Sequence, residues 1–172
     1  MPDVAKTHST TVDQLLDQAI RAVDAAKDLG AENAFATVVR ERGLELQWRD
    51  GQLEKVQEDA SRSLAIALYV DGRYSTHTTH DLDPERLKTF LRDAIALTRH
   101  LQPDPHRAIP DPALYEGRTK ADLDLVDDTL PQLTRKERIA WCGAMCEAAS
   151  ADDRVVSATT SVQDDHVLLA RA

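Results

Sequence analysis

Cysteine, aromatic residues and positive charge are all scarce in this chain of 172 residues. Two cysteines, Cys142 and Cys146, are too few for a disulfide framework, and a zinc ribbon would need a second pair. The net charge of −9 lacks the positive footprint that binds phosphate groups, which disfavours direct contact with nucleic acid. No apolar run approaches the roughly 20 residues of a membrane span, and no signal peptide opens the chain. We therefore expect a cytoplasmic protein.

Local catalytic motifs are missing as well. No histidine is followed by glutamate, and neither a glycine-rich phosphate loop nor a Gly-x-Ser-x-Gly turn occurs. The acidic segment Asp122–Asp128 lacks the glycine and the distal glutamate of a calcium loop, so we expect a solvated acidic edge. By local chemistry alone, residues 1–172 are expected to hold no catalytic, cofactor-binding or metal-binding residue.

Helical periodicity comes first among the features that are present. Thr11 and Gln14 form a capping-box pattern, and Gly30 supplies a left-handed stop, which predicts a helix over 12–29. Its expected buried stripe is Val12, Leu16, Ala19, Val23 and Ala26.

Strand patterns follow in the next fifty residues. Leu44, Leu46 and Trp48 alternate with polar residues before a hairpin signal at Asp50-Gly51. The run 64–70 is apolar on both faces and ends at a second signal, Asp71-Gly72, which is typical of a central strand. We expect a meander of about five strands between residues 34 and 80.

A second helix is predicted over 84–100, because Asp83 can cap it and Pro84 suits its first position. Its expected buried stripe is Leu87, Phe90, Leu91, Ala94, Leu97 and Leu101. Five of the seven prolines then fall between Gln102 and Pro131, which indicates a crossing or linker between two lobes.

The third predicted helix covers 134–150 and begins at a capping box formed by Thr134 and Glu137. Its inner face is expected to hold Ile139, Cys142, Cys146 and Ala149. Two strand-like runs follow, 155–162 and 167–170, joined through Asp164-Asp165.

Together these patterns predict an α+β fold: an antiparallel β-meander packed by helices, then an incomplete second lobe of a helix and strands. The expected domains are a first lobe at 1–101, a proline-rich linker at 102–132 and the start of a second lobe at 133–172. Since the sequence stops inside an apolar run, we expect a piece of a longer protein whose unpaired strand edges favour self-association.

The string STHTTHD places His77 and His80 three residues apart, with Asp81 beside them. Residues three apart converge on a helix but point to opposite faces of a strand. Because Tyr74, Thr76 and their neighbours favour a strand, we expect the two histidines to diverge. A metal site remains an alternative if the strand ends at Thr79 and turns. The cysteine pair has a similar alternative in redox or metal chemistry, but its place in an apolar stripe favours buried structural thiols.

Several strings in a fixed order resemble the amino-terminal part of the TldD/PmbA family, also called modulators of DNA gyrase. They are GLELQWRDGQLEKV (43–56), LYVDGRYSTHTTHDLDPERL (68–87), QPDP (102–105), DLDL (122–125) and ADDRV (151–155). The DLDL string and the end of the chain look more like the PmbA side, also called TldE, than the TldD side. The family places glycines near Ser63, Ala65 and Ser75, and no ligand where His77 and His80 stand, which weakens the metal interpretation.

The resemblance implies a zinc metallopeptidase assembly in which TldD-like and TldE-like subunits degrade unfolded peptides. Its zinc is held by a His-Glu-x-x-x-His motif and a cysteine in the later half of the TldD-like subunit, and positions 1–172 contain no such motif. The chain is then a non-catalytic amino-terminal domain, whose partner is a TldD-like subunit or a second copy. Two alternatives remain: a regulatory module acting on DNA gyrase, and a small metal enzyme using His77, His80 and Asp81.

Overall fold

The computed structural model describes residues 4–117, 119, 121–125, 127 and 129–172. The chain forms two compact units, and neither is a continuous stretch of sequence. Unit 1 is made of residues 1–40, 61–121 and 168–172, and unit 2 of residues 41–60 and 122–167. Long strands of one sheet contribute residues to both units.

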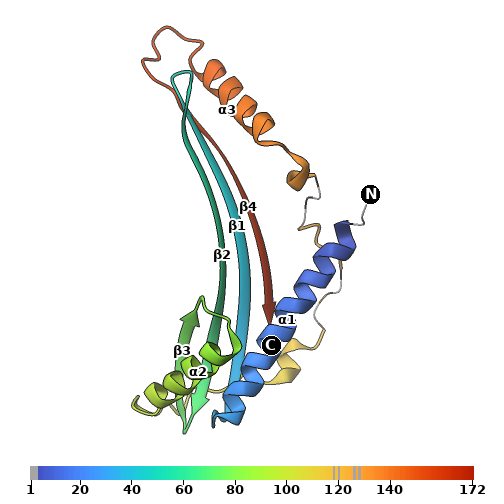
Figure 1. Cartoon of the computed structure of the whole chain (residues 1–172), viewed down its shortest axis with the longest axis vertical. Helices are drawn as coiled ribbons and strands as arrows, with labels where there is room; N and C mark the ends of the chain where they lie inside the picture. Colours follow the sequence, from blue (N-terminus) through green and yellow to red (C-terminus); the bar gives the residue numbers. More distant parts are fainter. Residues whose placement is uncertain (1–3, 118, 120, 126, 128) are drawn as a thin grey trace. The chain divides into compact units, whose positions relative to one another are not determined.

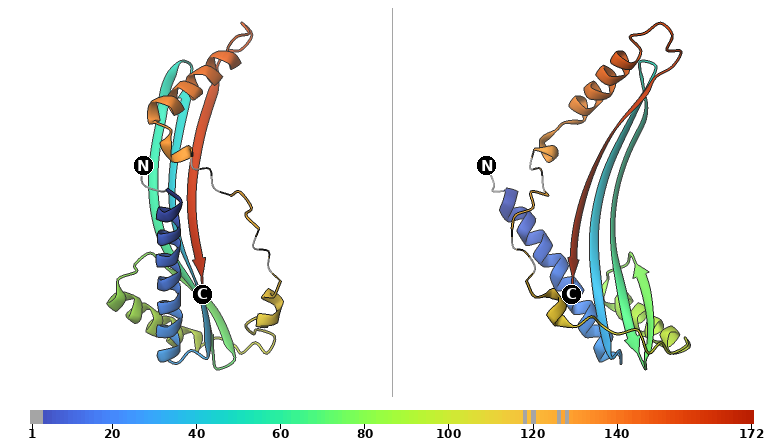
Figure 2. Two further views of the ribbon diagram at one scale, coloured as in Figure 1. Left: turned by 90° about the vertical axis from the view of Figure 1, so that its right-hand side faces the viewer. Right: turned by 180° about the vertical axis from the view of Figure 1, so that it is seen from behind.

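The described elements give an α+β fold, as the sequence predicts. In chain order they are α1 (Val4–Asp28), β1 (Asn33–Arg49), β2 (Gln52–Val70), β3 (Arg73–Thr79), α2 (Pro84–Thr98), the 3₁₀ helices η1 (Pro112–Tyr115) and η2 (Leu130–Gln132), α3 (Arg135–Ala149) and β4 (Thr159–Arg171). The strands form one sheet in the order β3-β2-β1-β4 (Figure 1). Both views of Figure 2 show β4 beside β1. None of the described helices is long and apolar enough to cross a membrane.

Both predicted hairpin turns are present. Asp50 and Gly51 join β1 to β2 with φ angles of 46° and 82°, and Asp71 and Gly72 join β2 to β3 with φ angles of 49° and 71°. Two successive positive φ values define the type I′ turn, which glycine and aspartate tolerate best. The second turn sets the register of the antiparallel β2–β3 pair, in which His77 lies opposite Ile66.

The number of strands differs from the expectation. Three strands, rather than about five, occupy residues 34–80, and β1 and β2 are 17 and 19 residues long. The polar residues of β1 and β2 lie on exposed parts of the sheet, where they do not interrupt the strands. The expected pair of strand-like runs joined through Asp164-Asp165 is also wrong, because one strand, β4, begins at Thr159 and runs through both residues without interruption.

Strand β4 pairs with β1 in the antiparallel sense. Ala36 and Ala172 exchange both backbone hydrogen bonds, at 2.8 and 3.0 Å, which is the signature of an antiparallel pair. In unit 2 the amide of Asp50 donates to the carbonyl of Ala158 at 3.1 Å.

Helix α1 starts earlier than predicted and faces its core through a different leucine. It begins at Val4, so the capping-box pattern at Thr11 lies inside the helix. Leu15 is buried, whereas Leu16 is exposed. The predicted stop at Gly30 is present: Gly30 has a φ of 100°, and hydrogen bonds from Gly30 to Lys27 and from Ala31 to Ala26 complete a Schellman motif.

Helix α2 begins as the sequence predicts. The Asp83 carboxylate accepts hydrogen bonds from the amides of Glu85 and Arg86, at 3.2 Å each, and Pro84 occupies the first turn. Its buried face differs from the prediction, because Ile95 and Thr98 replace Leu97 and Leu101, which are exposed. The core of unit 1 is formed by these residues: Leu15, Ala19, Ala22, Val23, Ala26, Ala31, Ala34, Ala36, Val38, Leu64, Ile66, Leu68, Val70, Leu91, Ala94, Ile95 and Ala170.

The proline-rich stretch is partly tied to unit 1. The amide of Asp104 donates to the carbonyl of Gly72 at 2.9 Å, and the Arg107 guanidinium lies 4.6 Å from the centre of the Tyr74 ring. The start of the stretch therefore lies against the β2–β3 hairpin.

Helix α3 forms the core of unit 2 with β1 and β4. Its predicted capping box is present, with hydrogen bonds in both directions between Thr134 and Glu137. Cys142 and Cys146 are buried, but Ala149 is exposed and Ile139 is only partly buried, so the expected inner face is half right. Gly143 brings the helix close to β1, since a Cβ there would lie 3.8 Å from the Trp48 ring.

Candidate functional site

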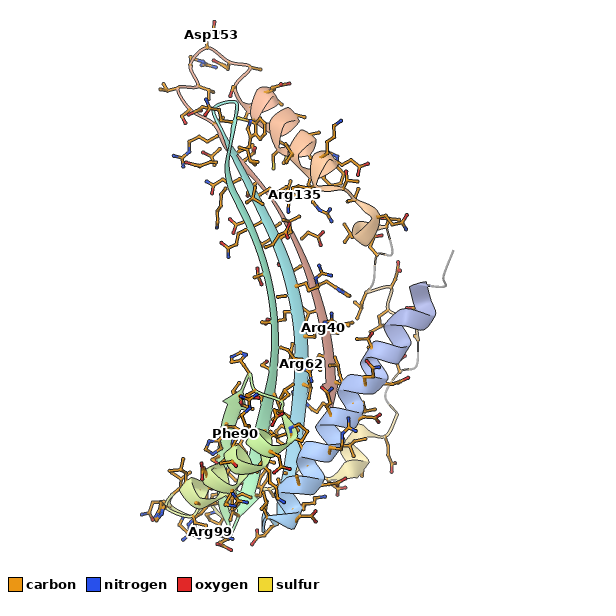
Figure 3. All side chains as sticks on the ribbon, viewed as in Figure 1. Arg40, Arg62, Phe90, Arg99, Arg135 and Asp153 are labelled. Atoms are coloured by element: carbon orange, nitrogen blue, oxygen red, sulfur yellow. The ribbon has the colours of Figure 1, made fainter. Side chains whose placement is uncertain are left out.

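The two histidines of STHTTHD are held by different neighbours in unit 1 (Figure 3 labels Arg62 and Phe90). His77 lies on β3, with Nε2 2.9 Å from the Ser75 hydroxyl and its ring edge-on to Phe90 at 6.3 Å between centroids. Burial lowers the pKa of His77 below its ordinary value. His80 lies just beyond the end of β3, and its Nδ1 donates to the carbonyl of Arg62 at 3.0 Å.

A small polar cluster lies beneath α2 beside His77. The Ser75 hydroxyl is 2.5 Å from the Thr98 hydroxyl, which in turn donates to the carbonyl of Ala94 at 2.7 Å. Thr98 is fully buried, so these contacts satisfy a hydroxyl that would otherwise be costly to bury. The cluster ties β3 to α2.

Asp81, the third possible ligand, binds residues at the start of α2 instead. Its carboxylate accepts from the amide of Asp83 at 3.1 Å and pairs with Arg86 Nε at 2.9 Å. Among the described residues, no three histidine, cysteine, aspartate or glutamate side chains come close enough to hold a metal ion. Zinc needs three or four converging ligands, so the described part of the chain does not fit a zinc site.

The two cysteines of α3 are free thiols, buried as predicted. Cys142 Sγ contacts the carbonyl of Leu46 at 3.9 Å, and Cys146 Sγ contacts the carbonyl of Ala158 at 3.5 Å. Burial raises the pKa of the Cys142 thiol. Because the thiolate is the reactive form, a buried thiol with a raised pKa is poorly suited to nucleophilic or redox chemistry.

The acidic segment is exposed wherever the structure describes its side chains. Asp122, Asp124 and Asp127 all face solvent, while Val126 and Asp128 lie outside the described residues. The Thr129 side chain and amide donate to Asp127 and lower the pKa of its carboxyl. The exposed aspartates agree with the expected solvated edge.

An acidic pair in the sheet of unit 2 escaped the sequence analysis. Gly43 lies in β1 between Asp59 and Asp165, because a Cβ at Gly43 would lie 2.7 Å from Asp59 Oδ1 and 3.1 Å from Asp165 Oδ1. Glycine thus leaves room for two carboxylates from neighbouring strands. Two carboxylates alone do not make a metal site, and Asp165 accepts a hydrogen bond from Gln163 at 2.9 Å.

A buried arginine of unit 2 with three hydrogen-bond acceptors was also missed. Arg138 is buried on α3 and donates to the carbonyls of Leu130, at 2.9 Å, and Leu133, and to the carboxylate of Asp164 on β4. It therefore joins η2, the start of α3 and the sheet. The spacing of 138, 142 and 146 is a regular four-residue stripe, and that pattern could have placed Arg138 on the inner face.

A known domain profile matches the part of the chain that builds most of β1 through α2. The profile describes domain 1 of the PmbA/TldA metallopeptidases and matches residues 36–98. Metalloprotease PmbA of Escherichia coli O157:H7 is 23% identical over 145 residues, which cover 84% of this chain and 32% of that protein. The PmbA homolog of Haemophilus influenzae is 26% identical over 155 residues, which cover 90% of this chain and 34% of the homolog. The chain thus spans about a third of the length of these relatives.

Solved structures share the fold. A Bacteroides thetaiotaomicron protein described as a candidate modulator of DNA gyrase has a TM-score of 0.85 at 29% identity, covering 91% of this chain and 36% of that one. TldE of Thermococcus kodakarensis has a TM-score of 0.68 at 12% identity, covering 90% of this chain and 35% of that one, and its likeness concerns the fold alone. The profile match, the curated relatives and the solved structures show that the chain is similar to proteins of the TldD/PmbA family.

Proposed function

We propose that this chain is the non-catalytic first domain of a TldD/PmbA-type metallopeptidase subunit. The observation that carries the proposal is the match of a metallopeptidase domain 1 to residues 36–98, which span most of β1, the strands β2 and β3, and α2. The whole protein works in a cytoplasmic, zinc-dependent assembly that degrades unfolded peptides. Zinc is bound outside residues 1–172, and this domain supplies architecture.

The partner in this proposal is a TldD-like subunit that carries the zinc. Support comes from the fold shared with a protein named TldE, the side of the family that the DLDL string also resembles.

Reconstitution tests this proposal. The natural protein that carries this chain is purified and mixed with a TldD-like subunit of the same organism, and the hydrolysis of an unfolded peptide is followed by mass spectrometry. We expect hydrolysis only from the pair. Equal hydrolysis by the TldD-like subunit alone would contradict the proposed role.

A second candidate function is regulation of DNA gyrase, favoured by the description of the Bacteroides relative. An acidic chain with a net charge of −9 could dock on a basic partner, and such docking would weaken with salt. Gyrase supercoiling assays with the natural protein at low and high salt discriminate between the two functions. A salt-sensitive effect on supercoiling without peptide hydrolysis would replace the peptidase role.

A further inference from the structure

Two threonines of α2 make the same local contact in different surroundings. The Thr89 hydroxyl donates to the carbonyl of Glu85, four residues earlier, at 3.2 Å. The Thr98 hydroxyl donates in the same way to the carbonyl of Ala94 at 2.7 Å. Thr89 is exposed, whereas Thr98 is fully buried and its Oγ1 also lies 2.5 Å from Ser75 Oγ on β3. Of these two threonines, Thr98 is the one that links α2 to the sheet.

The hydrogen bonds around Thr98 run in a single direction. A hydroxyl group carries one hydrogen, and that of Thr98 is used on the Ala94 carbonyl, which can only accept. Thr98 Oγ1 must therefore accept from Ser75, whose own hydrogen is used in turn. Ser75 Oγ then accepts from His77 Nε2 across 2.9 Å. The neutral His77 ring thus carries its hydrogen on Nε2 and its lone pair on Nδ1.

A further proton on His77 has to bind Nδ1, since Nε2 already carries a hydrogen. Among the described residues Nδ1 has no hydrogen-bond partner, and none of their buried side-chain nitrogens or oxygens lacks one, so Nδ1 reaches water. The rest of the ring is edge-on to Phe90 of α2, and His77 lies opposite Ile66 of β2. A charged imidazolium in this place is partly cut off from solvent, which costs free energy.

The charges on the elements around His77 are paired elsewhere or face solvent. On β3, Arg73 donates to two backbone carbonyls, and beyond its end Asp81 pairs with Arg86. The stretch of β2 that pairs with β3, Leu64–Val70, holds no acidic, basic or histidine side chain. The charged side chains of α2 are exposed: Glu85, Arg86, Lys88, Arg92 and Asp93. Burial is therefore the effect that lowers the pKa of His77.

From this geometry we propose that His77, Ser75 and Thr98 form a proton-sensitive latch that holds the last turn of α2 against β3. With His77 neutral, the hydrogen bonds run from the sheet to the helix and the latch is closed. A proton on Nδ1 puts a charge beneath α2, and lifting the last turn of the helix lets water reach that charge. The inference is independent of the proposed peptidase role.

The sign of the pH dependence follows from burial. Since burial lowers the pKa of His77 in the closed latch, the open form binds the proton first as the pH falls. The closed form is therefore fully favoured above pH 6.5 and loses this advantage below it. The last turn of α2 opens more often at acidic pH.

Hydrogen exchange of the natural protein that carries this chain tests the latch. From about pH 7.5 to about pH 5, the protection of amides 95–100, corrected for the intrinsic effect of pH, should fall at least about threefold, while protection in α1 stays within about twofold. In His77→Gln, which keeps an N–H donor but binds no proton, the fall at 95–100 should be absent. An equal fall in His77→Gln, or an equal fall in α1, would overturn the inference.

Substitution of Thr98 tests the link between sheet and helix. Thr98→Val keeps the shape of the side chain but removes the hydroxyl, so protection of the last turn at neutral pH should fall about tenfold, whereas Thr98→Ser should stay within about threefold. The matched control is Thr89→Val, which removes the same local hydrogen bond at an exposed position and should leave the last turn unchanged. If Thr98→Val does not fold, Ser75→Ala breaks the same link from β3 and should give the same fall. Unchanged protection of the last turn in Ser75→Ala or Thr98→Val would show that no latch exists.

Nitrogen NMR of the His77 ring tests the direction of the hydrogen bonds. At about pH 7.5, proton–nitrogen correlations should show a hydrogen on Nε2 and a bare Nδ1, as the order of donors requires. The His77→Gln spectrum assigns the signal. A hydrogen on Nδ1 with a bare Nε2 would mean that Ser75 donates to His77, and the proposed latch would be wrong.

Discussion

Replacing Arg138 by methionine should destabilise unit 2 strongly, because one side chain serves three acceptors. Arg138 donates to the carbonyls of Leu130 and Leu133 and to the Asp164 carboxylate. Methionine keeps most of the apolar stem but has no donor. The substitution removes a donor from two carbonyls and one carboxylate, although the Leu130 carbonyl keeps the hydrogen bond from the Leu133 amide.

The magnitude follows from burial. Breaking a buried ion pair by removing one partner costs about 3–5 kcal/mol, but the Asp164 side chain is 20% exposed, so water recovers part of that loss. Each lost hydrogen bond to a neutral carbonyl adds about 1 kcal/mol, less where water can reach the carbonyl. We therefore expect a loss of about 3 kcal/mol, which corresponds to a fall in Tm of roughly 6–12 °C for a chain of this size.

Tryptophan fluorescence isolates the effect, because both tryptophans, Trp48 and Trp141, belong to unit 2. Urea unfolding followed at this signal gives the free energy of unfolding of unit 2. The matched control is Arg99→Met in unit 1, which removes an exposed pair with Asp71 at 3.3 Å and should cost less than about 1 kcal/mol.

A double-mutant cycle with Asp164→Asn shows whether the two side chains act together. We expect a coupling above about 1 kcal/mol, since each change removes the same contact. A loss below about 1 kcal/mol for Arg138→Met, or strictly additive effects, would refute the reasoning.

Three further predictions concern titration and reactivity. Burial lowers the pKa of His77, so on acidification the unfolded chain binds a proton at this residue before the folded chain does. The contribution of His77 to stability is therefore present above pH 6.5 and lost as the pH falls. An NMR titration of the folded protein should place the midpoint of His77 below 6.5, and a midpoint at or above 6.5 would contradict burial as the cause. Hydrogen bonds from the Ala158 amide and the Ser157 hydroxyl lower the pKa of Asp50, so stability is lost as the pH falls below about 4, and Asp50→Asn should abolish that loss in acid unfolding curves. Cys142 and Cys146 should react with Ellman's reagent only as fast as unit 2 opens, and immediate labelling in the folded protein would show that they are accessible.

Local chemistry explains the parts of the fold that the sequence predicts well. The Asp-Gly pairs at 50–51 and 71–72 specify type I′ turns by their own backbone preferences, and the caps at Asp83 and Thr134 satisfy amides within three residues. These signals need no knowledge of distant contacts.

Helix faces and strand number depend on packing, which the sequence shows only indirectly. One residue rotates a helix face by 100°, so Leu15 and Leu16 are equally good candidates until the sheet is in place. For the same reason the sequence analysis placed Leu97 on the buried face of α2, where the structure has Ile95.

The contacts that matter most in unit 2 join residues far apart in sequence. Arg138 and Asp164 are 26 residues apart in the sequence. The carboxylates of Asp59 and Asp165, from two other strands, lie next to Gly43. Neither leaves a local motif. The expected domain boundaries near residues 102 and 133 stay a prediction.

The most direct test of the central claim is the zinc content of the natural protein carrying His77→Gln, His80→Gln and Asp81→Asn together, measured with the TldD-like partner that we propose. The account predicts the same zinc per assembly and the same peptide hydrolysis as the unchanged protein, because these three side chains have structural partners in unit 1. Loss of zinc and of hydrolysis in a variant that still folds would contradict it and would assign the metal to this domain.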